Sequence, residues 1–312
     1  MKTKIRVALL AGGRSGEREV SLAGAREVEK TLNADRYTVR RYDPATDLAK
    51  LATEAGEIDM AFILLHGPFG EDGTVQGMLD LLDIPYQGSG VLGSALAMDK
   101  NIAKLLYRNA GLTVAPWEMA RPGDVEDPAR LLSSLSLPVV VKPVRQGSSL
   151  GMSIVKEPAE LPAALAKAFA MDREVMVEQF VRGREITGGV LGNQELAALP
   201  LVEIIPGEAY DFFDYEAKYT KGASREVCPA ELPEELAVRA QATALAAHRA
   251  LQLRGYSRTD MILTEKGEIF VLETNTIPGM TPTSLLPQAA AAHGLPFAAL
   301  LDRLIELALE GR

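Results

Sequence analysis

The side chains best suited to chemistry gather in one stretch, where Arg258, Asp260, Glu273 and Asn275 interrupt two apolar runs. Two carboxylates and a carboxamide, with no His or Cys among them, form a hard oxygen donor set that suits Mg²⁺ or Mn²⁺ better than zinc. An arginine in the same set indicates that the metal serves a phosphate group, because both would offset its charge. The stretch therefore predicts a metal and phosphate site.

A β-hairpin is the element that must position these groups. The apolar runs, residues 257–263 and 268–275, flank a polar turn that contains Gly267, which is a typical hairpin signal. Because side chains alternate between the faces of a strand, one face of the second run is expected to carry Ile269, Val271, Glu273 and Asn275. If the turn holds an even number of residues, Asp260 lies opposite Val271 and projects from that face. The alternative is an edge hairpin whose polar side chains face water.

The segment after the hairpin favours the ligand-binding interpretation. Pro278 and Gly279 end the second strand, and Thr281, Thr283 and Ser284 open a helix. The backbone N–H groups at such a helix start are suited to an anion. The hairpin and the helix start would thus form one anion-binding edge.

Length and composition restrict the class of protein. The chain has 312 residues, enough for two or three domains, and 33 basic against 42 acidic residues give a net charge of −9. This charge argues against nucleic acid or an anionic membrane as the main partner. A single cysteine, Cys228, excludes an internal disulfide, and no apolar run approaches the roughly 18 residues of a membrane span. We expect a soluble, cytoplasmic α/β protein with no membrane partner.

Residues 1–88 alternate strand and helix patterns, which predicts a parallel sheet with helices on its faces. Ligands bind at the carboxyl ends of such strands, where two polar loops, residues 11–19 and 64–77, are expected. In the first loop the glycines do not match the dinucleotide pattern G-x-G-x-x-G, so a nicotinamide site is disfavoured. Glu17 could face a cationic group or simply complement a helix dipole. His66 follows a strand end, where a functional role is more common than elsewhere.

Residues 89–181 form a second predicted unit, which carries a phosphate-binding pattern. A Val-rich strand delivers Lys142, and the small residues of loop 147–151 offer backbone N–H groups that could fold over phosphates. The alternative is an ordinary turn with an exposed lysine, although a lysine inside an apolar strand must find a partner. Glu178 ends the next strand, and Glu185 follows it; a carboxylate there could read an adenine edge or accept ribose hydroxyls.

Residues 182–312 form the third predicted unit, with α+β character. Its segment 205–224 is polar and aromatic and has no helical or strand period, which is typical of a lid or binding loop. Lys218 and Tyr219 are the expected working groups of this lid. A long helix at 233–251 and an amphipathic helix at 297–309 surround the hairpin.

Several motifs, in order along almost the whole chain, resemble those of the D-alanine–D-alanine ligases of the ATP-grasp fold. They are AGGRSGEREVS, HGPFGEDGTVQG, GSGVLGSALAMDK, VVVKPVRQGSSLG, DFFDYEAKY and LETNTIPGMTPTS. The resemblance implies an ATP-dependent ligase of peptidoglycan precursor synthesis that joins two D-alanine molecules through a D-alanyl phosphate. It also implies a homodimer. A D-alanine–D-lactate ligase and a non-catalytic ATP-grasp protein are the alternatives.

The same resemblance implies roles for individual residues around ATP. Groups that hold the phosphates would be Lys100, Lys142, Ser148, Ser149 and Lys218. Adenine and ribose would contact Glu178, the backbone of Phe180 and Val181, and Glu185. Two Mg²⁺ or Mn²⁺ ions would bind Asp260, Glu273 and Asn275, with Glu273 bridging them and Asn275 also near ATP.

The resemblance further implies how the two amino acids bind. Glu17 would bind the ammonium group of the first D-alanine, with His66 nearby, and Ser148 and Tyr219 would position Glu17 and the lid. Ser284, Leu285 and the turn after Pro278 would bind the carboxylate of the second. Arg258 and the Gly279 amide would stabilise the developing negative charge.

Overall fold

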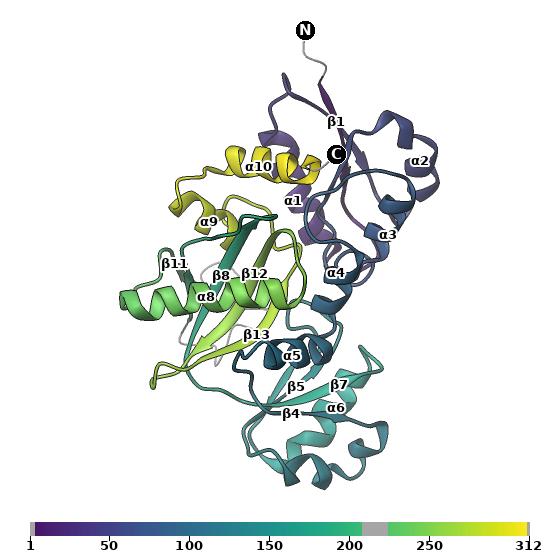
Figure 1. Cartoon of the computed structure of the whole chain (residues 1–312). Coiled ribbons are helices and arrows are strands. Elements are labelled where there is room, and N and C mark those ends of the chain that lie inside the picture. Colours follow the sequence, from purple (N-terminus) through teal and green to yellow (C-terminus); the bar gives the residue numbers. More distant parts are fainter. Residues whose placement is uncertain (1–3, 208–223, 311–312) are drawn as a thin grey trace.

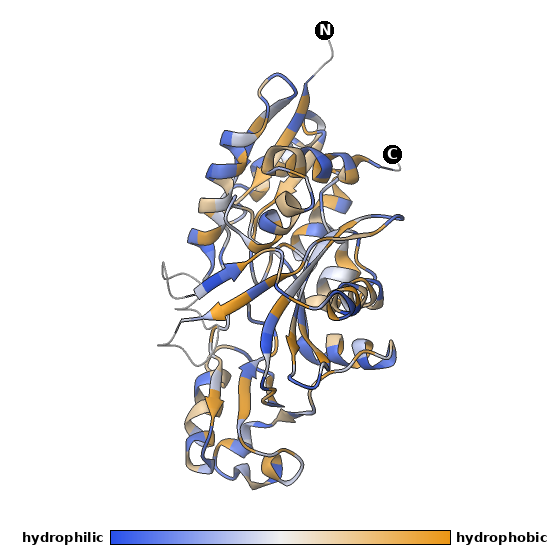
Figure 2. Ribbon diagram, turned by 90° about the vertical axis from the view of Figure 1, so that its left-hand side faces the viewer, coloured by the Kyte–Doolittle hydropathy of each residue, from blue (hydrophilic) through white to orange (hydrophobic). Residues whose placement is uncertain are grey.

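The computed structural model describes residues 4–207 and 224–310, which form three β-sheets with helices packed on them (Figure 1). The N-terminal sheet lies at the top of the view, a four-stranded sheet lies at the bottom, and the largest sheet lies between them. The helices of Figure 2 alternate hydrophobic and hydrophilic segments, because each buries one side on a sheet.

The N-terminal sheet is parallel, as the sequence predicts, and its strand order is β2-β1-β3. Its elements are β1 (Ile5–Leu10), α1 (Arg18–Thr31), β2 (Tyr37–Tyr42), α2 (Leu48–Thr53), the 3-10 helix η1 (Ala55–Glu57), β3 (Met60–Ile63) and α3 (Thr74–Leu81). Val7 and Leu9 pack toward the C-terminal helix α10 (Phe297–Leu309), whereas Ala8 and Leu10 belong to the core on the other face. The sheet is therefore covered on both faces, and its loops are left to carry the polar groups.

The four-stranded sheet is antiparallel, with strand order β4-β7-β5-β6. Its elements are β4 (Trp117–Ala120), η2 (Pro122–Val125), η3 (Pro128–Ser133), β5 (Val139–Pro143), β6 (Ser153–Val155), η4 (Pro158–Glu160), α6 (Leu161–Phe169) and β7 (Val175–Gln179). Val139, Val141, Val175 and Val177 form a core with α6. The opposite face of β5 and β7 is left for a ligand cavity.

The largest sheet is antiparallel and runs in the order β11-β10-β8-β12-β13, with β9 paired to β8. Its strands are β8 (Arg184–Gly192), β9 (Ala197–Ala198), β10 (Val202–Pro206), β11 (Ser224–Val227), β12 (Gly255–Leu263) and β13 (Ile269–Asn275). The helices α8 (Glu234–Ala250) and α9 (Leu285–Ala292) follow the ends of β11 and β13. The lid predicted at 205–224, with Lys218 and Tyr219, lies almost entirely outside the described residues.

Two helices of the predicted second unit, α4 (Val91–Met98) and α5 (Lys100–Asn109), pack on the largest sheet. Ala97, Ala103 and Tyr107 share a core with Ala244 and Val271. These helices bring Lys100 to the hairpin. The unit boundaries at residues 88 and 181 remain a prediction.

The hairpin β12–β13 exists, but its expected register is wrong. Its turn contains five residues, and a β-bulge at Leu272 lets Asp260 pair with Glu273 instead of Val271. Because the bulge adds an unpaired residue, it resets the alternation of side chains. Val271 and Ile269 therefore face the core, while Glu273 and Asn275 face the same side as Asp260. The four polar groups still come together, for a different reason than the alternation suggests.

Candidate active site

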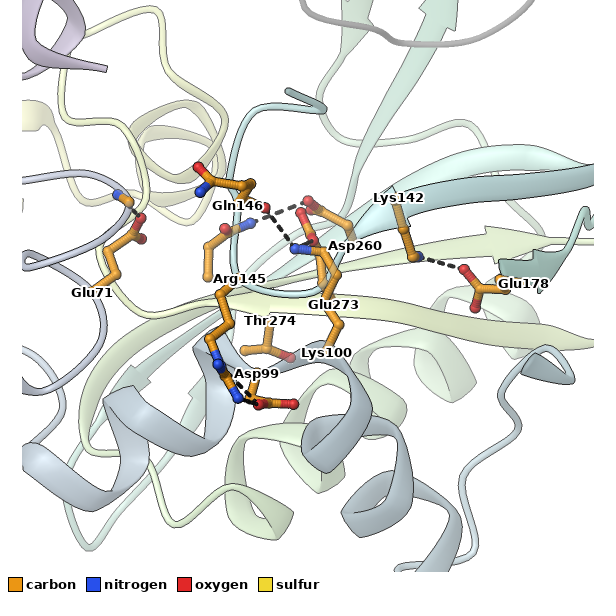
Figure 3. Close-up of polar contacts among 12 residues, drawn as sticks. Glu71, Asp99, Lys100, Lys142, Arg145, Gln146, Glu178, Asp260, Glu273 and Thr274 are labelled. Carbon is orange, nitrogen blue, oxygen red and sulfur yellow. Dashed lines mark hydrogen bonds and ion pairs between the residues drawn. The ribbon is translucent and has the colours of Figure 1, made fainter. Parts of the chain in front are cut away.

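Arg258, Asp260, Glu273 and Asn275 project from one face of the β12–β13 hairpin, as predicted. Figure 3 shows Asp260 and Glu273 side by side, next to Lys100. Arg258 makes a bidentate ion pair with Asp260, with both N–O distances at 2.8 Å. The Asn275 carboxamide nitrogen donates to the same carboxylate at 3.2 Å. Paired neighbours on adjacent strands thus concentrate two acids, an amide and a guanidinium in a small volume.

A chain of buried hydroxyl groups lies on the opposite face of the hairpin. Thr274 lies between the two predicted ligands Glu273 and Asn275 and points to the opposite face. The Tyr107 hydroxyl donates to the Thr274 hydroxyl at 2.7 Å, and the Thr259 and Thr274 hydroxyl oxygens lie 3.0 Å apart. These contacts fix both strands where the acids leave them. The sequence gives no sign of this contact, because the helical position of Tyr107 alone does not show that it reaches the hairpin.

A cavity separates the hairpin from the four-stranded sheet. Residues that line it come from both sheets and include Lys100, Lys142, Ser149, Glu178, Phe180, Val181, Glu185, Asp260 and Glu273. Lys100 connects its two sides, since its ammonium group lies 3.1 Å from a Glu273 oxygen and donates to the Gln146 carbonyl at 2.8 Å. Most of the residues that the resemblance assigns to ATP and metal therefore meet in one cavity. Ser148 and Asn275 do not line it, and Lys218 lies outside the described residues.

Lys142 does find a partner, as a lysine inside an apolar strand must. Its ammonium group is ion-paired with Glu178, and Lys104 pairs with the other oxygen of the same carboxylate. Burial alone would raise the pKa of Glu178, but the two ammonium groups hold it below its ordinary value. Lys104 is fully buried and stacks over Trp117, 5.1 Å from the ring centroid. The sequence gives no sign of this role, because Lys104 looks like an ordinary helical lysine.

The loop 146–152 has an unusual backbone. Ser148 and Ser149 both have positive φ angles, 49° and 57°, although neither is glycine. Non-glycine residues seldom adopt this conformation, and a run of two at a cavity rim indicates a functional constraint. The Ser148 hydroxyl donates to the Glu17 carboxylate, which joins this loop to the N-terminal unit. The structure thus brings Ser148 and Glu17 together.

His66 and Glu17 lie near each other at the carboxyl ends of the parallel strands. Both are buried, and the negative charge of Glu17 acts to raise the pKa of the His66 imidazole. Burial nevertheless lowers the pKa of His66, which favours the neutral imidazole. His66 also lines a second, mostly apolar pocket together with Gly13 and Phe69.

The start of α9 places Gly279 beside Ser284. A side-chain Cβ at Gly279 would lie 3.0 Å from the Ser284 oxygen, so a larger residue would crowd that hydroxyl. The Ser284 oxygen accepts the Thr281 N–H at 3.1 Å, and Leu285 begins the helix. These residues form the expected helix-start edge next to the hairpin.

Within the described ranges, no helix is long and apolar enough to cross a membrane.

Comparison with known proteins agrees with this arrangement. The family description "D-ala D-ala ligase C-terminus" matches residues 106–306, and "D-ala D-ala ligase N-terminus" matches residues 43–89. The D-alanine–D-alanine ligase of Syntrophobacter fumaroxidans is 59% identical over 307 residues, which cover 98% of either chain.

Solved structures confirm the expected ATP-grasp architecture. The D-alanine–D-alanine ligase of Bacillus anthracis, complexed with ATP, is 35% identical with a TM-score of 0.84, and the match covers 98% of this chain and 97% of that one. The VanG D-Ala:D-Ser ligase of Enterococcus faecalis is 34% identical with a TM-score of 0.85, over 98% and 100% of the two chains. The chain therefore belongs to the D-alanine–D-alanine ligase family.

Proposed function

We infer that this chain uses ATP to join two D-alanine molecules into D-alanyl-D-alanine for peptidoglycan precursor synthesis. The observation that carries this inference is the cavity in which two lysines face a pair of acids on the bulged hairpin. Relatives that match the whole chain are named for the same reaction. Because ATP is an intracellular substrate, we place the reaction in the cytoplasm.

ATP would occupy the cavity between the four-stranded sheet and the hairpin. Phe180, Val181 and Glu185 line the end nearest β7 and β8, and they would receive adenine and ribose. Lys100, Lys142 and the loop with Ser148 and Ser149 would contact the phosphates. Lys218 and Tyr219, from the lid, would complete the enclosure. Such a water-poor enclosure is needed, since an acyl phosphate hydrolyses readily.

The acids of the hairpin suit two Mg²⁺ or Mn²⁺ ions. Asp260, Glu273 and Asn275 present hard oxygen donors from one face, which is the donor set these ions prefer. When bound, the ions would offset the charge of the transferring phosphoryl group. In this structure Lys100 pairs with Glu273 and Arg258 pairs with Asp260, so each of these acids has a cationic partner.

The first D-alanine would bind by its ammonium group to Glu17, which Ser148 holds and His66 adjoins. Its carboxylate is a poor electrophile and would accept the γ-phosphoryl group to form D-alanyl phosphate. The amine of the second D-alanine would then attack the acyl carbon. A C–N bond forms, and the bond between the acyl carbon and the phosphate oxygen breaks.

The second D-alanine would bind at the start of α9. Ser284 and the backbone at Leu285 would hold its carboxylate, while Arg258 and the Gly279 amide would stabilise the tetrahedral oxyanion. Gly279 suits this role because it leaves the approach to Ser284 open. We also propose a homodimer formed through the N-terminal unit, where Phe69 and Leu81 expose large apolar side chains.

Product analysis tests the function. The purified protein with ATP, Mg²⁺ and D-alanine should release ADP in step with D-alanyl-D-alanine, one for one. D-Lactate and D-serine, offered beside D-alanine across pH, measure the choice of the second substrate. Preferred ester formation at neutral pH would make the chain a D-alanine–D-lactate ligase. ATP binding without D-alanine-dependent ADP release would make it non-catalytic.

Lys104→Met should raise the KM for ATP about tenfold and leave the KM for D-alanine nearly unchanged. The reason is that Lys142 would share its charge between Glu178 and a phosphate, and Lys104 would then balance more of the charge of the buried carboxylate. Methionine keeps most of the unbranched apolar side chain, being one atom shorter, but removes the charge. Steady-state kinetics with each substrate varied in turn measure the effect. Lys266→Met, in the exposed hairpin turn, is the control; equal rises in both KM values for Lys104→Met would contradict this role.

A further inference from the structure

Glu71 is a buried acid that the proposed chemistry does not use. It follows β3 in the loop that contains His66, and only 9% of its surface is exposed. One carboxylate oxygen accepts the Gly67 N–H at 2.7 Å, within the same loop. The other accepts the N–H of Ile277 at 3.3 Å, from a segment 206 residues later in the chain. Glu71 thus connects the N-terminal loop to the segment that leaves the hairpin.

Ile277 is held from three directions. Its side chain is 2% exposed and belongs to the core of the N-terminal unit, together with Leu10 and Leu65. Its backbone also makes a hydrogen-bonding contact with the His66 ring. An apolar anchor, an N–H acceptor and a second polar contact therefore fix a single peptide. Because Asn275 precedes it by two residues and Gly279 follows it by two, the position of this peptide determines the course of the backbone between them.

Both carboxylate oxygens of Glu71 accept backbone N–H groups. Burial raises its pKa to about 8, and the neighbouring Glu17 carboxylate acts in the same direction. The two backbone N–H groups and the Arg258 charge oppose this rise. No lysine or arginine hydrogen-bonds to Glu71 in the described part of the chain. Its polar contacts are instead directed at two backbone groups on opposite sides of the site.

We propose that Glu71 is a positioning residue for the second half of the reaction, because it fixes the Ile277 peptide and thereby the Gly279 amide and Ser284. This proposal rests on the proposed function. If the segment 277–284 is displaced, the first D-alanine is still phosphorylated at the other end of the site. Water then competes with the amine for the acyl phosphate, which gives D-alanine and phosphate in place of dipeptide. Glu71 would thus couple ATP use to bond formation.

The test is the ratio of ADP released to D-alanyl-D-alanine formed in Glu71→Gln. Glutamine keeps the shape but offers one acceptor, and its NH₂ group would oppose an N–H donor. We expect dipeptide formation to fall about tenfold, as for loss of one buried hydrogen bond, while ADP release falls less. The ratio should then rise from one to three or more. The KM for ATP should stay close to that of the unmodified protein.

Two further variants separate positioning from stability. Gln87→Ala removes a buried side chain that bonds both backbone groups of Ile63 in the same unit, so it should destabilise without raising the ratio. Ile277→Ala removes the apolar anchor of the clamped peptide and should raise the ratio like Glu71→Gln. The double variant should be no worse than the larger single effect, because both act on one peptide.

The outcomes are distinct. A ratio that stays at one in both Glu71→Gln and Ile277→Ala, with all rates reduced in parallel as in Gln87→Ala, would overturn the proposal. If Glu71→Gln does not fold, as judged by thermal unfolding, the ratio in Ile277→Ala decides. A failure of the unmodified protein to form dipeptide would refute the proposed function instead.

Discussion

Glu273→Gln is expected to lower kcat by about a thousandfold or more, which corresponds to roughly 4 kcal/mol of transition-state stabilisation. Glutamine is nearly the same size but neutral, and it provides one oxygen where the carboxylate provides two. Glu273 is also the acid that Lys100 contacts at 3.1 Å, so the change weakens the link between hairpin and cavity. Rates of ADP and dipeptide formation at saturating Mg²⁺ measure the loss.

The fold should tolerate this change. The Glu273 side chain is 25% exposed, and a partly exposed ion pair contributes at most about 1 kcal/mol. The hairpin is held instead by its other face, where Met261 and Val271 enter the core. Glu265→Gln, in the exposed turn of the same hairpin, is the matched control and should behave like the unmodified protein. If Glu273→Gln retains a tenth of the activity or loses much thermal stability, the assignment of the hairpin face is wrong.

The sequence was sufficient to predict which groups meet at the hairpin, but not how they meet. Residue type and apolar flanks identify Arg258, Asp260, Glu273 and Asn275, because such side chains seldom interrupt a buried strand without a purpose. The bulge at Leu272 leaves no mark in the alternation pattern. It is a property of the paired strands, and a pattern read along one strand cannot reveal it.

Other omissions have a similar physical origin. Lys104 and Tyr107 lie on one helix and reach partners more than seventy residues away in the chain. Glu71 contacts Ile277 across 206 residues. Each role depends on which surfaces pack together, and local spacing carries no information about that. The parallel N-terminal sheet, in contrast, follows from short-range alternation of strands and helices and is confirmed in full.

Arg258→Lys should lower kcat about a hundredfold and leave the KM for ATP within about twofold, as for loss of one preorganised oxyanion donor. Lysine keeps the charge but cannot reproduce the two parallel N–H bonds that Arg258 makes to Asp260. The cationic group would then lose its fixed orientation toward the developing oxyanion. Single-turnover measurements, which separate phosphoryl transfer from dipeptide formation, should place most of the loss in the second step.

Arg258→Met separates charge from orientation. It leaves Asp260 buried without its bidentate partner, and an uncompensated buried charge costs about 3–5 kcal/mol. Arg258→Met should therefore lose thermal stability as well as activity, whereas Arg258→Lys should lose mainly activity. Adding Asp260→Asn to Arg258→Met should restore much of the stability, because the unpaired charge is gone, but none of the activity. If instead the double variant recovers turnover, Arg258 serves only to neutralise Asp260, and the oxyanion must be stabilised by the Gly279 amide alone.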